Sequence, residues 1–83
     1  MEITVEQFEK LNDDEKIVFD IRPETDRAYG LIPDSVSVEE DELRANPPSD
    51  KAKKIVVYCA KGILSIDIAE WLLEQGYDAY SLQ

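Results

Sequence analysis

The chain lacks the residues that build metal centres and disulfide-linked scaffolds. It has no histidine, a single cysteine and three glycines among 83 residues. Without histidine or a second cysteine, neither a common zinc or iron–sulfur ligand set nor an internal disulfide can form. No apolar run approaches the roughly 20 residues that cross a bilayer, and the N-terminus lacks the features of a signal peptide. We therefore expect no resident metal, no membrane partner and a reducing, cytoplasmic location.

Basic residues are also scarce. The chain has nine Lys and Arg residues and nineteen Asp and Glu residues, which gives a net charge of −10. The nine cations are scattered along the chain. A nucleic-acid partner needs clustered cations, so this class of function is excluded. The negative field repels small anions and attracts a protein with a basic docking face.

The length and composition predict one small globular domain. A chain of 83 residues has room for a single core, and a hydrophobic fraction of 43% is typical of a folded protein. The one linker-like stretch, 46–50, contains two prolines and is interpreted as a loop. We therefore assign residues 1–83 to one domain.

The hydrophobic patterning predicts strands that alternate with helices. Apolar runs predict strands over 17–21, 35–38, 55–58 and 79–82. Helical spacing, caps and stop signals predict helices over 5–12, 23–29, 39–44 and 63–74, the first of which begins with a capping box formed by Thr4 and Gln7. In the last helix Leu64, Ile68 and Leu72 are expected to face the core, with Trp71 beside them. The order indicates an α/β fold: a small parallel sheet with helices on both faces.

The only cysteine stands at a chemically informative place. Cys59 ends the apolar run 55–58 and is followed by a glycine-containing loop and a helix. At the carboxyl end of a strand, the next helix begins with unpaired backbone N–H groups. Such groups in residues 60–64 would stabilise a thiolate, Lys61 adds a positive charge, and Gly62 permits a tight curl. Cys59 is therefore the leading candidate for a nucleophile.

These residues resemble the active loop of the rhodanese-like (sulfurtransferase) family. That loop has a cysteine at a strand end, five residues including a glycine, and a Ser or Thr that opens a helix. The matching segment here is Cys59-Ala60-Lys61-Gly62-Ile63-Leu64-Ser65. Three further segments extend the match over nearly the whole chain. Asp20-Ile21-Arg22 resembles the family's Asp-x-Arg, and Gly30-Leu31-Ile32-Pro33-Asp34-Ser35 resembles a degenerate form of its Gly-His-Ile-Pro-Gly-Ala. The segment from Leu73 to Tyr77 resembles the end of the family's helix before the last core strand.

Several positions depart from the family pattern. Leu31 replaces the usual histidine, Asp34 and Ser35 replace Gly-Ala, and the loop has one cation where many active members have two. The family's Gly-Gly and the helix beyond it do not follow Gln83. We interpret the chain as a minimal rhodanese-like domain, or one truncated after its last core strand.

The resemblance implies a ping-pong transfer of sulfane sulfur with no metal or organic cofactor. Cys59 would carry a persulfide; Ala60, Lys61, Gly62, Ile63, Leu64 and Ser65 would bind the substrate; Asp20 and Arg22 would support the site. The donor would be thiosulfate or a protein persulfide such as that of a cysteine desulfurase, and the acidic surface favours the protein. The acceptor would be a sulfur-carrier protein activated by an adenylating enzyme.

Other interpretations remain open from the sequence. Cys59 is also compatible with a small core residue in a catalytically inactive rhodanese-homology module that binds or regulates a partner. Asp20 and Arg22 are compatible with a plain salt bridge, and Ser65 with a helix N-cap. A tyrosine-phosphatase loop is disfavoured, because it needs an arginine six positions after the cysteine, where Ser65 stands.

Overall fold

The computed structural model describes residues 2–60 and 63–82, and its centre is a five-stranded parallel sheet. The strands lie in the order β1-β5-β4-β2-β3. Their bounds are Glu2–Ile3 (β1), Lys16–Asp20 (β2), Val36–Ser37 (β3), Lys54–Tyr58 (β4) and Asp78–Leu82 (β5). β4 is therefore the middle strand, hydrogen-bonded to β2 on one side and β5 on the other.

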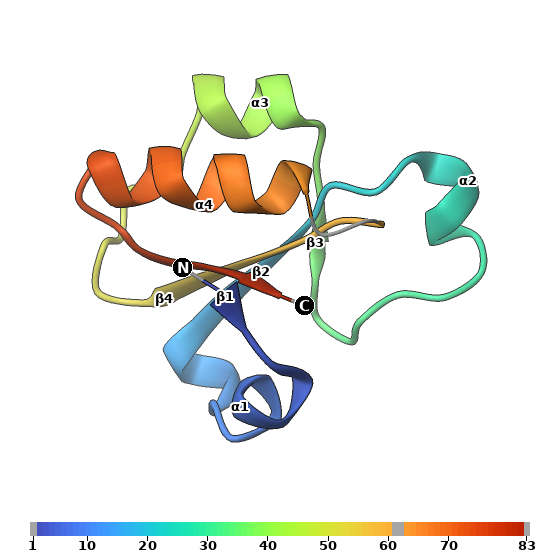
Figure 1. The fold of residues 1–83 in the computed structure, drawn as a ribbon, viewed down its shortest axis with the longest axis horizontal. Coiled ribbons are helices and arrows are strands. Elements are labelled where there is room, and N and C mark those ends of the chain that lie inside the picture. The colour runs from blue at the N-terminus through green and yellow to red at the C-terminus, as the bar shows by residue number, and fades with distance from the viewer. Residues whose placement is uncertain (1, 61–62, 83) are drawn as a thin grey trace.

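Helices cover both faces of this sheet (Figure 1). Their bounds are Val5–Glu9 (α1), Glu24–Arg27 (α2), Glu40–Ala45 (α3) and Leu64–Glu74 (α4), with a 3₁₀ turn at Asp13–Glu15 (η1). α3 and α4 lie over one face, α1 lies on the other, and α2 projects beyond the end of β2. The α/β architecture predicted from the sequence is confirmed.

The alternation of side chains along β4 divides the core into two clusters. Ile55 and Val57 point into the larger cluster beneath α4, whereas Val56 belongs to the smaller cluster on the α1 side. All three side chains are fully buried. A strand buried on both faces must be apolar at every position, which explains the uninterrupted run that marks β4 in the sequence.

The helix that follows β4 is held by a stripe of small and branched residues. Ile68, Ala69 and Leu72 are fully buried, and Trp71 packs half-buried against the same cluster. The expectation that Leu64 belongs to this stripe is wrong, because its side chain is 39% exposed. Leu64 is the first residue of the helix, one turn before the buried Ile68.

The predicted elements are all present, but several are shorter than expected. The first helix ends at Glu9 instead of Asn12, and the predicted helix 23–29 covers only Glu24–Arg27. β1 was not predicted, since two residues carry no periodic signal. The predicted capping box is confirmed: Gln7 N donates to Thr4 Oγ1 at 3.1 Å, and Thr4 N donates to Gln7 Oε1 at 3.0 Å.

Two classes of feature are absent from the described ranges 2–60 and 63–82. None of the helices there has the length and apolar character needed to cross a membrane. The same ranges contain no cluster of three or more His, Cys, Asp or Glu side chains placed to bind a metal ion.

Truncation of Leu72 tests the core beneath α4. Leu72→Ala should lower the free energy of unfolding by about 2–5 kcal/mol, because it leaves a cavity at a fully buried position. Leu73→Ala is the matched control on the same helix, where the side chain is 38% exposed and the loss should be much smaller. Urea unfolding measures both values, and equal losses would contradict the assigned orientation of α4.

Candidate functional site

Cys59 lies directly after β4, at the carboxyl end of the middle strand. Its side chain is 8% exposed and contacts the larger core cluster. The sulfur faces the start of α4, where the backbone N–H of Ser65 donates to Sγ at 3.4 Å. The apolar surrounding by itself opposes ionisation of the thiol, whereas the directed main-chain donor stabilises an anionic sulfur.

Two buried serine hydroxyls extend from this sulfur into the sheet. Ser65 Oγ lies 3.3 Å from Cys59 Sγ and 2.6 Å from Ser81 Oγ of β5. Both serines are almost completely buried. A hydroxyl can accept a hydrogen bond from a thiol or donate one to a thiolate, so this pair can serve either charge state of Cys59.

The interpretation of Ser65 as a helix N-cap is wrong. α4 begins at Leu64 and Ile63 occupies the N-cap position, so Ser65 lies within the first turn. Its side chain turns inward to Cys59 and Ser81 instead of capping backbone N–H groups. The loop resemblance grouped Ser65 with Cys59, and the two side chains are in contact, whereas the N-cap role of the Ser65 hydroxyl is not observed.

A pocket of about 390 Å³ opens above the cysteine. Its lining comes from the end of β2, from α2, from the cysteine loop and from the start of α4. The described lining residues are Ile21, Arg22, Pro23, Asp26, Cys59, Ala60, Ile63, Leu64 and Asp67. Among the predicted substrate-binding residues, Ala60, Ile63 and Leu64 join Cys59 at this pocket, and Ser65 lies beneath the sulfur. Lys61 and Gly62 lie outside the described residues.

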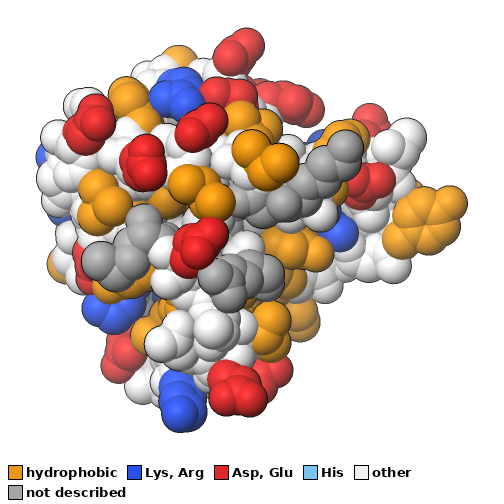
Figure 2. All heavy atoms as spheres, in the orientation of Figure 1, with side chains coloured by type: hydrophobic (Ala, Val, Ile, Leu, Met, Phe, Trp, Pro, Cys, Tyr) orange, Lys and Arg blue, Asp and Glu red, His pale blue; other side chains and the backbone are white. Residues whose placement is uncertain are grey.

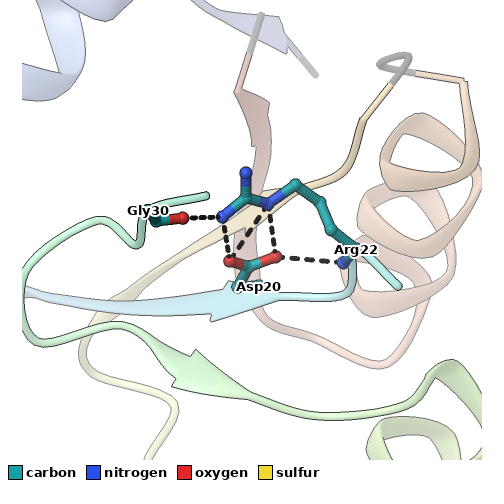
Figure 3. A network of polar contacts seen from close by, with 3 residues as sticks. All are labelled: Asp20, Arg22 and Gly30. Carbon is teal, nitrogen blue, oxygen red and sulfur yellow. Dashed lines mark hydrogen bonds and ion pairs between the residues drawn. The ribbon is translucent and has the colours of Figure 1, made fainter. Parts of the chain in front are cut away.

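The predicted pair Asp20 and Arg22 forms a tightly bonded ion pair (Figure 3). Arg22 Nε lies 3.0 Å from Asp20 Oδ1, and Nη2 lies 2.8 Å from Oδ2, so the contact is bidentate. The backbone N–H of Arg22 also donates to Oδ1 at 3.0 Å. Nη2 further donates to the carbonyl of Gly30 at 2.6 Å, which fastens the α2–β3 connection to the end of β2.

Arg22 lines the pocket, but its positive charge is balanced by Asp20. Its guanidinium is paired with the fully buried Asp20 and stacks 4.7 Å from the centroid of the Tyr58 ring. Burial alone would raise the pKa of Asp20, but the hydrogen bonds and the charge of Arg22 outweigh it and hold the pKa below the ordinary value. The pair therefore supports the shape of the site, and Asp20 itself does not line the pocket.

Sequence reasoning missed Ser81, Asp26 and Asp67. Ser81 pairs with Val57 across the parallel register of β4 and β5, which brings it next to the cysteine end of β4. Only the register of the two strands gives this placement. Asp26 and Asp67 lie in two separate helices, and single carboxylates in helices carry no sequence signal of a shared pocket.

The depressed pKa of Asp20 predicts a specific loss of stability in acid. Above the ordinary carboxyl value of 3.8 the pair contributes its full stabilisation, and this contribution is lost as the pH falls through the lower pKa of the folded state. Asp20→Asn should therefore flatten the fall in unfolding free energy between about pH 5 and about pH 2. Urea unfolding across this range tests the change, with the exposed Asp41→Asn as control; a curve for Asp20→Asn as steep as that of the parent would contradict it.

The serine pair should show energetic coupling. Ser65→Ala leaves the hydroxyl of Ser81 buried without its partner, which should cost about 1–3 kcal/mol of unfolding free energy. The double variant with Ser81→Ala should cost less than the sum of the two single variants, since it removes both polar groups. Additive losses in urea unfolding would show that the two hydroxyls do not interact.

Comparison with known proteins agrees with this arrangement. The family model described as "Rhodanese-like domain" matches residues 4–83. The chain is 29% identical over 77 residues to "Putative sulfurtransferase YtwF" of Bacillus subtilis, covering 90% of this chain and 75% of that protein. It is 30% identical over 84 residues to the tRNA uridine(34) hydroxylase of Cytophaga hutchinsonii, of which it spans only 27%.

A solved structure extends the match from sequence to fold. The rhodanese-related protein of Thermoplasma volcanium superposes with a TM-score of 0.84 at 25% identity, covering 99% of this chain and 82% of that protein. A family match over nearly the whole chain and the same five-stranded architecture lead to one conclusion: the chain belongs to the rhodanese-like domain family.

Proposed function

We propose that the protein is a sulfurtransferase in which Cys59 carries sulfane sulfur as a persulfide. The observation that carries this proposal is the position of the thiol at a pocket, with the N–H and hydroxyl of Ser65 directed at its sulfur. A buried structural cysteine has no need of such a pocket or of a main-chain donor. Membership of the rhodanese-like family supports the same reaction class.

The transfer proceeds in two displacements at sulfur. The Cys59 thiolate attacks the outer sulfur of a donor persulfide, a new S–S bond forms at Cys59, and the donor S–S bond breaks to release the donor thiolate. A nucleophilic acceptor then attacks the outer sulfur of the Cys59 persulfide, and the Cys59 thiolate leaves with the electron pair of the broken bond. No net redox change accompanies the cycle.

The site residues have distinct roles in this scheme. The backbone N–H of Ser65 donates to the sulfur. The Ser65 hydroxyl, which accepts from the Cys59 thiol in the structure, would donate to the thiolate once the thiol proton is lost, and Ser81 orients this hydroxyl. Ala60, Ile63 and Leu64 line the pocket to which Cys59 belongs and would contact the substrate there. Lys61 and Gly62, which lie outside the described residues, are proposed as further substrate-binding residues of the same loop. Asp20 and Arg22 act as positioning residues, because they fix the end of β2 and the Gly30 carbonyl beside the pocket.

The donor we propose is a protein persulfide, such as that of a cysteine desulfurase, in a reducing cytoplasm. The net charge of −10 opposes the approach of thiosulfate and favours a basic protein surface. A sulfur-carrier protein activated by an adenylating enzyme is the corresponding acceptor. The alternative is an inactive module in which Cys59 no longer carries sulfur, and it is favoured by the leucine at position 31 where the family pattern has histidine.

Intact-mass spectrometry separates the two functions. After incubation with a cysteine desulfurase and cysteine, or with thiosulfate, the protein should gain the mass of one sulfur, and dithiothreitol should remove it. Cys59→Ser should abolish this gain while the unfolding free energy changes little, because the exchange of one atom preserves the side-chain volume. Absence of the adduct with either donor would favour the inactive module.

A further inference from the structure

The described wall of the pocket is negatively charged. Asp26 of α2 and Asp67 of α4 line it, and neither forms an ion pair with another described residue. Arg22, the one cation among the described lining residues, is bound to Asp20 (Figure 3). Asp26 also acts on the Arg22 guanidinium, but the charge of Arg22 is balanced by Asp20. Asp26 and Asp67 therefore leave the described site with a net negative charge that acts on any group that enters.

The rest of the described lining is apolar, and much of it is accessible. Ile21, Pro23 and Ala60 contribute to the wall, while Ile63 is 68% exposed and Leu64 is 39% exposed. Acidic side chains are spread over the face of the molecule in Figure 2, with few basic ones between them. A charge entering this pocket meets the local carboxylates and the general negative field together.

The charge of a sulfur compound should therefore influence how readily it reaches Cys59. An anion loses the solvation of bulk water as it enters and gains no described cation in return, whereas a cation is attracted by both carboxylates. Thiosulfate carries two negative charges, so it is disfavoured both by the loss of its solvation and by the carboxylates of the pocket. A carrier with positive charge beside its reacting sulfur is favoured.

We propose that Asp26 and Asp67 make the pocket selective for a thiol or persulfide on a basic protein segment. This inference rests on the proposed role of Cys59 as the reacting thiol. A protein is favoured over a small aminothiol because apolar side chains of the pocket lining are exposed. Ile63 and Leu64 line the pocket and are exposed, and Tyr29 and Leu31, the chain neighbours of the Gly30 whose carbonyl accepts from the lining residue Arg22, are 94% and 55% exposed.

Activated disulfides of different charge test this selectivity without requiring sulfur transfer. Cys59 is the only cysteine, so it is the only thiol that can react. The 2-pyridyl disulfides of cysteamine, mercaptoethanol and mercaptopropionate are cationic, neutral and anionic, with the same leaving group. The Cys59 thiolate attacks the carrier sulfur, the S–S bond breaks, and pyridine-2-thiolate leaves and is protonated to the absorbing thione. Each rate is divided by the rate of that reagent with N-acetylcysteamine, which corrects for intrinsic reactivity.

The corrected rates should fall from the cationic to the neutral to the anionic reagent. Asp26→Asn and Asp67→Asn should each reduce the cation-to-anion ratio by about threefold to tenfold at low salt, and added salt should also reduce it. Glu74→Gln, at the opposite end of α4, removes an equal charge and should leave the ratio nearly unchanged. Lys61 is present in every variant, so its contribution is constant in these comparisons.

Peptides distinguish a protein carrier from a small aminothiol. Two peptides with the same 2-pyridyl disulfide on a central cysteine, one flanked by lysine and leucine and the other by glutamate and leucine, are compared with the cysteamine reagent. The basic peptide should react faster than both. If cysteamine reacts as fast as the basic peptide, the carrier is a small aminothiol and the protein assignment is overturned.

Equal corrected rates for the three small reagents, or a ratio unchanged in both Asp→Asn variants, would overturn the inference as a whole. Its failure is distinguishable from failure of the proposed function. If Cys59 reacts with charge selectivity but never takes up sulfane sulfur, the inference about the pocket holds and the proposed sulfur transfer is refuted. If Cys59 takes up sulfane sulfur but reacts without charge selectivity, sulfur transfer holds and the inference about the pocket is refuted.

Discussion

The burial of β4 on both faces is the constraint on which the rest of the structure depends. Its three central side chains are inaccessible to water, and strands β2 and β5 occupy both of its edges. The end of β4 is consequently fixed in three dimensions, and with it the position of Cys59. The thiol meets Ser65 of α4, and the Ser65 hydroxyl in turn meets Ser81 of β5, so the cysteine loop, α4 and β5 are linked by one chain of polar contacts.

A second constraint shapes the opposite wall of the site. The buried carboxylate of Asp20 requires a partner, and Arg22 supplies it two residues later while also binding the carbonyl of Gly30. The connection after α2 is thereby held beside the pocket. The same contact balances the charge of Arg22, so that Asp26 and Asp67 give the described part of the site its net negative charge.

Much of the fold was predictable because its signals are local. The apolar run of β4 and the alternation of strands with helices indicated a parallel α/β sheet, and the capping box at Thr4 fixed the start of α1. The resemblance to the family's active loop grouped Ser65 with Cys59, and the two residues are in contact. The tertiary features were not predictable: strand register brings Ser81 to Ser65, and two separate helices bring Asp26 and Asp67 to one cavity. The backbone conformation at Asp34 was not predictable either. Asp34 has a positive φ of 64°, which is uncommon for a residue other than glycine, and it stands where the family pattern has glycine.

The central claim is that the Cys59 sulfur faces the pocket as an acceptor of sulfur and is not only a core side chain. A crystal structure of the protein after exposure to a persulfide donor tests it most directly. The account predicts electron density for a second sulfur bonded to Cys59 Sγ, extending into the cavity between Ala60 and Leu64. An unmodified Cys59 whose sulfur packs into the apolar cluster beneath α4, with the Ser65 N–H directed elsewhere, would contradict it.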